Sequence, residues 1–392
     1  MATENKKQLK DNKFGLTGTK KKIGINYWRF EFNAVEEYSG AEQMFFIELE
    51  MINPWLSPNE ILLGFKPRVK ITSDDLQYAL AGTQSAQSFD TESIIQPSYC
   101  SIRVGKLGET ASQLCSYFPV KEMSFYTKPF EVVYGECSFS EDALKGCVEI
   151  STEEKNAHPE YLCDCGSARW DLKYETQTEF LDGYNNNGNR WFPSGLKTTF
   201  TGKITFDGVD YLVDSRKSAG YIDRYWGRDF PDTWFHISSS NLTSVITGRT
   251  LFNSSFAVKG IFDERVSFLG KFDELELEFL ADSSKRTYNI VWDCSQMPQS
   301  EDPESNLLHW SLSIDNKNWV VDIDVFCRIK ELFNRNIELP EGGRKVMNLL
   351  QGATGTGEFK LYRKNGTVIE QIEHAQLTKV ICEFGHTEEG EF

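Results

Sequence analysis

The chain has 392 residues and a formal net charge of −16 at pH 7. This length exceeds one ordinary hydrophobic core and predicts two domains or one large β assembly. The negative charge repels polyanions, so it argues against nucleic acid or an anionic membrane surface as partners. No apolar stretch reaches the roughly 18 residues that a membrane-spanning helix needs.

Two features of the sequence bear on the cellular compartment. Residues 1–22 are rich in lysine, but no apolar segment follows them and they lack the arginine-rich pattern of a transit sequence. We interpret them as a flexible basic tail. The nine cysteines are scattered without the spacing of a disulfide scaffold. Together these features favour the reducing cytoplasm.

Strand signals recur in nearly every part of the chain, as apolar residues at every second position. The segments 28–33 and 45–51 are the first examples, and Pro54 ends the second of them. The apolar face of each strand is expected to pack inward. The opposite face, with Arg29 and Glu48 among its polar residues, is expected to meet water.

Two hairpins are indicated further along the chain by their turn chemistry. The segment 200–213 reverses at Asp207-Gly208, and the segment 359–369 reverses at Asn365-Gly366. An Asp-Gly or Asn-Gly pair favours the tight turn that matches the twist of two antiparallel strands.

Helical pattern is scarce and is limited to two short segments, 73–80 and 345–350. Strands at spacings of roughly ten residues, separated by turns, are typical of sandwiches and barrels. We therefore expect a mainly β chain with few short helices. Its expected domains are 23–250 and 251–386.

Familiar catalytic and ligand motifs are missing from the sequence. The glycine run 352–357 lacks the Gly-Lys-Ser/Thr ending of a phosphate loop and leads into a strand instead of a helix. The pair Cys163 and Cys165 does not have zinc-site spacing. The histidines have no HExxH or triad-like neighbours. No metal and no cofactor are expected.

The segment 218–234 is the most informative part of the chain, because it gathers aromatic residues around carboxylates. In a strand, Asp223 and Tyr225 lie on one face, and Arg224 and Trp226 lie on the other. Aromatic neighbours that desolvate a carboxyl group raise its pKa, and a protonated carboxyl is a general acid. The other interpretation is a β-corner whose aromatic residues only pack.

Indole rings lie near this carboxyl in the sequence. The faces of Trp226 and Trp234 could stabilise a carbocation by cation–π attraction. His236 follows Trp234 by two residues and shares its face in a strand. A lone histidine is more often a satisfied core or surface residue than a functional one.

The run 220–234, Gly-Tyr-Ile-Asp-Arg-Tyr-Trp-Gly-Arg-Asp-Phe-Pro-Asp-Thr-Trp, resembles a signature of tocopherol cyclase-like proteins. Weaker matches in the same order are Trp28-Arg-Phe, Asn53-Pro54, Trp170-Asp-Leu, Trp191-Phe-Pro and Glu358-Phe-Lys-Leu-Tyr, so the resemblance covers about residues 23–385. It implies two lipocalin-like antiparallel β-barrel or sandwich domains with a ligand cavity.

The resemblance also implies an isomerase or cyclase that protonates a C=C bond without a cofactor. The expected catalytic residues are Asp223, Tyr225 and Trp226, and the expected substrate-binding residues are Trp28, Tyr221, Trp234 and His236. Two residues depart from the family pattern, since Tyr225 stands where Asn is common and Asp223 where Glu is frequent. The substrate class therefore stays open between a prenylquinol, a terpenoid and an unsaturated fatty acid.

Two other functions remain open at this point. A lipocalin-like carrier would use the same cavity without chemistry, and a hydratase would add water to the same cation. In each case the partner is a hydrophobic small molecule, collected through transient contact with a membrane. Neither the ligand nor the oligomeric state follows from the sequence.

Overall fold

The computed structural model describes residue 16 and residues 18–64, 96–127, 129–158, 161–180, 183–186, 189–216, 220–262, 265–282, 288–297, 306–342 and 345–389. The regular structure of these residues is nearly all β, which confirms the expected class. The described helical elements are α4 (Thr152–Ala157), η1 (Gly18–Lys21), η2 (Val120–Glu122) and η4 (Ile329–Glu331). None of them is long and apolar enough to cross a membrane. The helix expected at 73–80 lies outside the described residues.

Within the described residues the first sheet has 14 strands, and they pair antiparallel except where β10 meets β19. Their bounds are β1 (Ile25–Glu36), β2 (Glu42–Ile52), β3 (Tyr99–Leu107), β4 (Ser112–Phe118), β5 (Ser124–Thr127), β6 (Phe130–Tyr134), β7 (Cys137–Ser140), β8 (Ala143–Ile150), β9 (Gly166–Thr178), β10 (Tyr184–Asn186), β11 (Asn189–Phe206), β12 (Val209–Val213), β13 (Gly220–Gly227) and β19 (Ala281–Asp282). β12 and β13 lie end to end between β1 and β11, so β13 is central in this sheet.

The second sheet has 11 antiparallel strands built around the long hairpin of its last two. Their bounds are β14 (Thr233–Ser239), β15 (Leu242–Ser244), β16 (Ser254–Phe262), β17 (Arg265–Phe272), β18 (Leu275–Phe279), β20 (Asn289–Gln296), β21 (Leu307–Asp315), β22 (Trp319–Arg328), β23 (Phe333–Glu338), β24 (Lys345–Asn365) and β25 (Val368–Glu389). The chain changes sheets between Gly227 and Thr233, so β14 and β15, which the sequence placed in the domain 23–250, pair with this second sheet.

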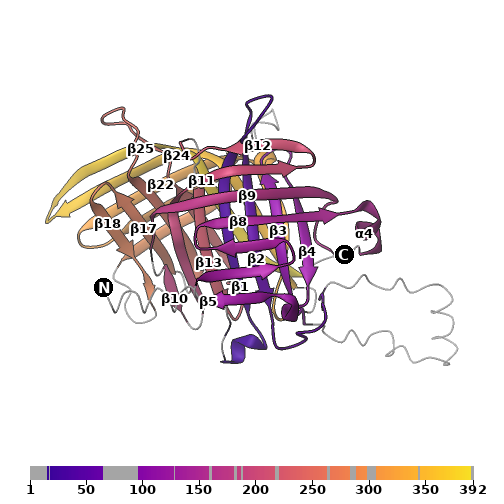
Figure 1. The fold of residues 1–392 in the computed structure, drawn as a ribbon. Helices are drawn as coiled ribbons and strands as arrows, with labels where there is room; N and C mark the ends of the chain where they lie inside the picture. The colour runs from indigo at the N-terminus through magenta and orange to yellow at the C-terminus, as the bar shows by residue number, and fades with distance from the viewer. Residues whose placement is uncertain are drawn as a thin grey trace.

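Three layers of apolar side chains hold the molecule together. The first sheet curls so that β4 contacts β8 and β9, and it encloses a core that includes Trp28, Phe30 and Trp170. The second sheet covers a separate core on its far face. A third layer, here called the interface layer, contains residues of both sheets, for example Tyr225 and Met347. Figure 1 shows the first sheet, indigo to magenta, beside the second, orange to yellow.

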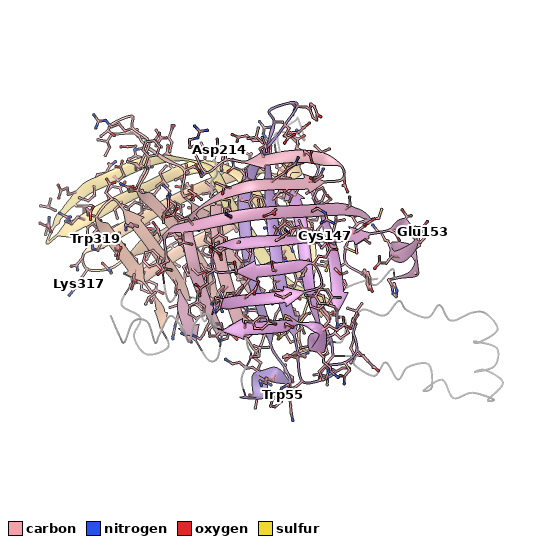
Figure 2. All side chains as sticks on the ribbon, in the orientation of Figure 1. Trp55, Cys147, Glu153, Asp214, Lys317 and Trp319 are labelled. Carbon is pink, nitrogen blue, oxygen red and sulfur yellow. The ribbon has the colours of Figure 1, made fainter. Side chains whose placement is uncertain are left out.

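The polar face of β1 and β2 does not meet water, which corrects the expectation from the alternating pattern. Arg29, Glu31, Glu48 and Glu50 are all buried, because the second sheet packs over this face. The side chains of Cys147 and Glu153 lie away from that contact, on the outer side of the first sheet, and Trp319 lies at the far end of the second (Figure 2).

The turn residues predicted both hairpins correctly, but the prediction of a short helix at 345–350 was wrong. Phe206 pairs with Val209 and Asn365 pairs with Val368, so both tight turns are confirmed. The segment 345–350 is the start of β24. Pairing with β23 on one side and β25 on the other outweighs its weak helical pattern.

The glycine run 352–357 lies inside β24, where it allows close packing of backbone. A Cβ atom on Gly357 would lie 1.9 Å from the carbonyl oxygen of Asp324 in β22. Since this neighbour is backbone, it cannot move aside without disturbing the strand pairing. Gly357 is therefore required for the register of β22 and β24.

We expect Gly357→Ala to lower the free energy of unfolding by about 1–3 kcal/mol, because the added methyl group overpacks the strand pair. Urea denaturation measures this change. Thr356→Ala, at the exposed neighbouring position, is the control and should change stability little. Equal stability of both variants would contradict the close approach.

Candidate functional site in the interface layer

Two rows of polar side chains face each other across the interface layer. In the first sheet, paired residues of β13, β1, β2 and β3 form the row Asp223, Arg29, Glu48 and Arg103. In the second sheet, paired residues of β16, β14, β25 and β24 form the row Lys259, His236, Glu383 and Gln351. All of these side chains are buried. Polar groups in such a place need partners, and two pairs join the rows directly, Lys259 with Asp223 and Glu383 with Arg29.

Asp223 lies at one end of the first row and pairs with a lysine of the second sheet. Its Oδ2 atom accepts a hydrogen bond of 2.9 Å from Trp191 Nε1 and lies 3.3 Å from Lys259 Nζ. The same ammonium donates to the Tyr27 hydroxyl at 2.7 Å and lies 4.7 Å from the centre of a Trp234 ring. The other oxygen, Oδ1, has no hydrogen-bond partner among the described residues.

Arginine side chains compensate the other carboxylates of the rows. Arg29 forms an ion pair with Glu383 and lies 3.1 Å from Glu48. Burial alone would raise the pKa of Glu383, but Arg29 and the hydrogen bond with His236 lower it to about 2. Burial likewise opposes ionisation of Glu48, and Arg335 and Arg29 lower its pKa to about 2. Both groups are ionised at neutral pH.

Glu31 behaves differently from these two carboxylates. It accepts a hydrogen bond of 2.8 Å from Gln351 and lies 3.1 Å from Arg29. Burial nevertheless raises its pKa to about 8, because Arg29 is shared with two other carboxylates. Glu31 is therefore mostly protonated at neutral pH. It adds no full negative charge to the layer.

His236 is held in one tautomer by Glu383. Its Nδ1 atom lies 2.9 Å from Glu383 Oε2, and an ionised carboxylate can only accept, so Nδ1 carries the proton. Burial lowers the pKa of the imidazole. Nε2 therefore has a free lone pair, and it has no hydrogen-bond partner among the described residues. A neutral, oriented histidine with a free Nε2 can act as a general base.

Tyr221 lies between His236 and a small recess in the protein. The two ring centres are 5.1 Å apart, and the Tyr221 hydroxyl has no hydrogen-bond partner in the described parts of the chain. Burial raises its pKa, so the phenol stays protonated. The recess is lined by Tyr221 and Leu196 of the first sheet and by Ser238 and Ile381 of the second. The recess has a volume of about 10 Å³, which is room for one water molecule.

The structure brings together only part of the residues expected from the sequence. Asp223, Tyr221 and Tyr225 share the interface face of β13, and Trp234 and His236 face them from β14. The Tyr225 hydroxyl donates to the carbonyl of Asp229, so it is already engaged.

Trp28 and Trp226 do not join this group. Trp28 belongs to the core inside the first sheet, with the Arg224 guanidinium 4.3 Å from the centre of its ring. Arg224 also lies 5.8 Å from a Trp226 ring. Because side chains alternate across a strand, neighbours of Asp223 in sequence point to the opposite face. Trp28 and Trp226 therefore do not form walls for Asp223.

Sequence reasoning missed the second-sheet partners of the site. Lys259 stands in the apolar strand segment 256–262, and Glu383 stands in the apolar segment 380–384. A single charge within an otherwise buried strand was the available signal, because it needs a partner of opposite charge. Among the described residues, no group of histidine, cysteine and carboxylate side chains has the arrangement of a metal site.

No family model matches the chain, and no curated protein is similar to it in sequence. Solved structures with 10% identity include an AttH-type protein from Nitrosomonas europaea, with a TM-score of 0.42 and coverage of 91% of this chain and 93% of that one. Kievitone hydratase from Nectria haematococca has a TM-score of 0.42 and coverage of 92% and 88%. CghA has a TM-score of 0.40 and coverage of 94% and 90%. At these scores the likenesses carry no conclusion about activity, and the tocopherol cyclase resemblance stays a prediction.

We expect Lys259→Met to lower the free energy of unfolding by about 3–5 kcal/mol, because it leaves the Asp223 carboxylate buried without a cation. Adding Asp223→Asn should restore much of this loss, since the amide carries no charge. Urea denaturation of both variants is the measurement, with the exposed Lys173→Met as control. A double variant no more stable than Lys259→Met would rule out the pairing.

Glu31 makes the stability depend on pH. Its folded pKa of about 8 exceeds the ordinary value of 4.5, so its contribution is full below pH 4.5 and is lost as the pH rises through 8. Glu31→Gln removes this contribution. In the parent, the free energy of unfolding changes with pH through Glu31 by at most about 1.4 kcal/mol per pH unit. The variant should therefore gain stability over the parent between pH 5 and pH 8. Denaturation curves of the parent and the variant across this pH range measure the gain. A stability difference that does not change with pH would contradict the prediction. The control is Glu149→Gln at an exposed position, and an equal gain in this control would also contradict it.

Proposed function

We propose that the chain is a cofactor-independent enzyme that moves a proton on a hydrophobic small molecule, as an isomerase, a cyclase or a hydratase does. The observation that carries this proposal is the buried His236, whose Nδ1 is fixed by Glu383 and whose Nε2 is free. Such an arrangement prepares a base and shields it from water. Most buried polar atoms have a hydrogen-bond partner, and Nε2 has none among the described residues, which supports the proposal.

The proposed reaction begins with the transfer of a carbon-bound or water proton to His236 Nε2. The neighbouring Tyr221 phenol returns a proton to another substrate atom, and the imidazolium then reprotonates the phenolate. Both residues end as they began, so the cycle needs no oxidant or other reactant. Loss and gain of a proton at two carbons isomerises an alkene, and attack by the activated water hydrates it.

Asp223 has a different role in this proposal from the one expected of it. Asp223 Oδ2 lies 3.3 Å from Lys259 Nζ, and a carboxylate in an ion pair only accepts hydrogen bonds and has no proton to give to an alkene. We assign Asp223 a positioning role: it joins the two sheets through Lys259 and accepts a hydrogen bond from Trp191, and so helps to hold the layer in which His236 lies. Acid-initiated cyclisation by Asp223 would require the loss of this ion pair.

A carrier function is the alternative, and the matched charges of the two rows favour it. Cations and carboxylates that pair across the interface layer join the two sheets even if no reaction occurs there. In a carrier, however, the free Nε2 of His236 would bring no benefit.

Deuterium uptake separates the enzyme from the carrier. We expect the protein to incorporate solvent deuterium into at least one member of a panel of prenylated quinols, terpenoids and unsaturated fatty acids, followed by mass spectrometry. His236→Gln should slow this uptake by about 100-fold or more. The control is His309→Gln, because His309 lies in β21 outside the interface layer. No uptake by the parent would favour the carrier, and normal uptake by His236→Gln would exclude this base.

The pH dependence gives a second test. Since burial lowers the pKa of His236 below its ordinary value of 6.5, the base is mostly neutral at pH 7 and above. The rate of deuterium uptake should fall as the pH decreases, with the midpoint of the fall below pH 6.5. A midpoint above pH 6.5 would contradict a buried neutral histidine as the base.

A further inference from the structure

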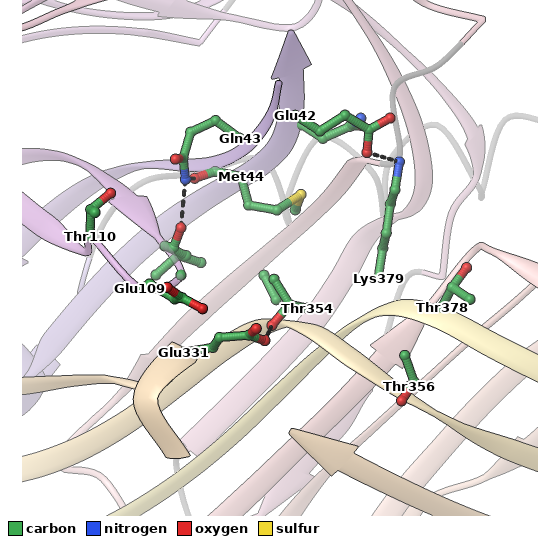
Figure 3. A pocket seen from close by; sticks show the side chains of 14 residues that line it. Glu42, Gln43, Met44, Glu109, Thr110, Glu331, Thr354, Thr356, Thr378 and Lys379 are labelled. Atoms are coloured by element: carbon green, nitrogen blue, oxygen red, sulfur yellow. Dashed lines mark hydrogen bonds and ion pairs between the residues drawn. The ribbon is translucent and has the colours of Figure 1, made fainter. Parts of the chain in front are cut away.

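A groove with a volume of about 470 Å³ opens between the two sheets, at the end of the interface layer where β1 reaches Asn33. Its first-sheet side comes from β2 and from the turn after β3, and its second-sheet side comes from η4, β24 and β25. Figure 3 shows Met44 projecting between these two sides. The volume is that of a typical small-molecule site.

Each charged side chain that lines the groove has an ion-pair partner, and for Glu331 this partner is Arg328 at 3.5 Å. Glu42 of β2 forms an ion pair with Lys379 of β25 across the opening, as the dashed line in Figure 3 shows. Glu109 lies 2.9 Å from Lys330, and this contact also joins the first sheet to the second. A charged ligand group would have to break one of these pairs. The groove therefore favours an uncharged ligand.

The remaining lining separates into apolar and hydroxyl-bearing parts. Met44 and Ala353, which belong to the interface layer, form an apolar base. Thr110, Thr356 and Thr378 place hydroxyl groups nearer the opening. Hydroxyl groups donate and accept hydrogen bonds, and an alcohol or polyol does the same. This lining fits an amphiphile with a hydroxylated head and an apolar chain.

A bulge in β25 shapes this side of the groove. Gly355 pairs with Val380 and Gly357 with Leu377, so the segment 378–379 lies opposite one residue of β24. Lys379 has a φ of 52°, a left-handed conformation that is unfavourable for a non-glycine residue. Bulges often redirect a side chain beside a functional site, and this one places Lys379 opposite Glu42.

The recess beside Tyr221 shares Met44 and Lys379 with the groove, but its volume is only about 10 Å³, too small for an alkyl chain. We infer that the groove binds an amphiphile with an uncharged, hydroxylated head group, whose apolar chain ends against Met44 and Ala353. The inference rests on the proposed function only for what happens to the ligand after it has bound. Binding itself does not require His236 to be a base.

Calorimetric titration with three ten-carbon probes, each below its micelle concentration, tests the inference. Monodecanoylglycerol has an uncharged hydroxylated head, decanoate an anionic head, and decyltrimethylammonium a cationic head. The parent protein should bind the first at least about tenfold more tightly than the other two, a difference of about 1.4 kcal/mol. Equal affinity for all three, or no binding of monodecanoylglycerol, overturns the inference.

Two variants locate the binding. Met44→Trp fills the base of the groove and should weaken monodecanoylglycerol binding by about tenfold or more. Met297→Trp is its control, because Met297 lies next to β20, which β21 and β22 separate from β24. Lys379→Gln leaves Glu42 without its cation, so it should selectively improve binding of decyltrimethylammonium. The inference is contradicted if Met297→Trp weakens binding as much as Met44→Trp does. It is also contradicted if Lys379→Gln leaves the affinity for decyltrimethylammonium unchanged.

The two proposals fail in different ways. His236→Gln should keep the parent affinity for monodecanoylglycerol, because the histidine does not line the groove. Binding without any deuterium uptake would sink the enzymatic proposal and leave the groove in place. Deuterium uptake by a protein that does not bind monodecanoylglycerol would sink the groove and leave the enzyme in place.

Discussion

Ion pairs across the two sheets are the interactions on which the rest of the structure depends. Lys259 with Asp223, and Glu383 with Arg29, each join one sheet to the other in a buried layer. Removing a charge from water costs several kcal/mol, so each carboxylate is tolerated only while its cation faces it. A shift of one residue in the register of β13 or β14 would turn these side chains to the wrong face. The charges therefore specify how the sheets pack, and this packing positions the candidate base.

The same alternation decides which residues can act together. Tyr221 and Asp223 meet His236 in the interface layer, whereas Arg224 and Trp28 lie in the core on the other side of the first sheet. Neutral and ionised groups are also separated within the layer. Burial raises the pKa of Glu31 and keeps it mostly protonated, whereas Arg29 and His236 lower the pKa of Glu383 and keep it ionised. The ionised Glu383 fixes the histidine tautomer on which the proposed chemistry rests.

The sequence predicted local structure well where one strand or one turn contains the information. Period-two patterns and the pairs Asp207-Gly208 and Asn365-Gly366 were sufficient for the strands and both hairpins. They also placed Asp223 in an aromatic environment. These patterns could not show that the second sheet covers β1. A polar strand face that meets water has the same sequence pattern as one that packs on a matching polar face. Lys259 was missed for this reason, since its partner lies 36 residues away.

The protonation of His236 is the most direct test of this account. Nitrogen NMR on protein labelled at histidine can report both ring nitrogens of His236 between pH 5 and pH 8, with His236→Gln used to assign the signals. We expect a mostly neutral imidazole with the proton on Nδ1 and an unprotonated Nε2 at pH 7 and above. A proton on Nε2, or a charged imidazolium at pH 7, would contradict it.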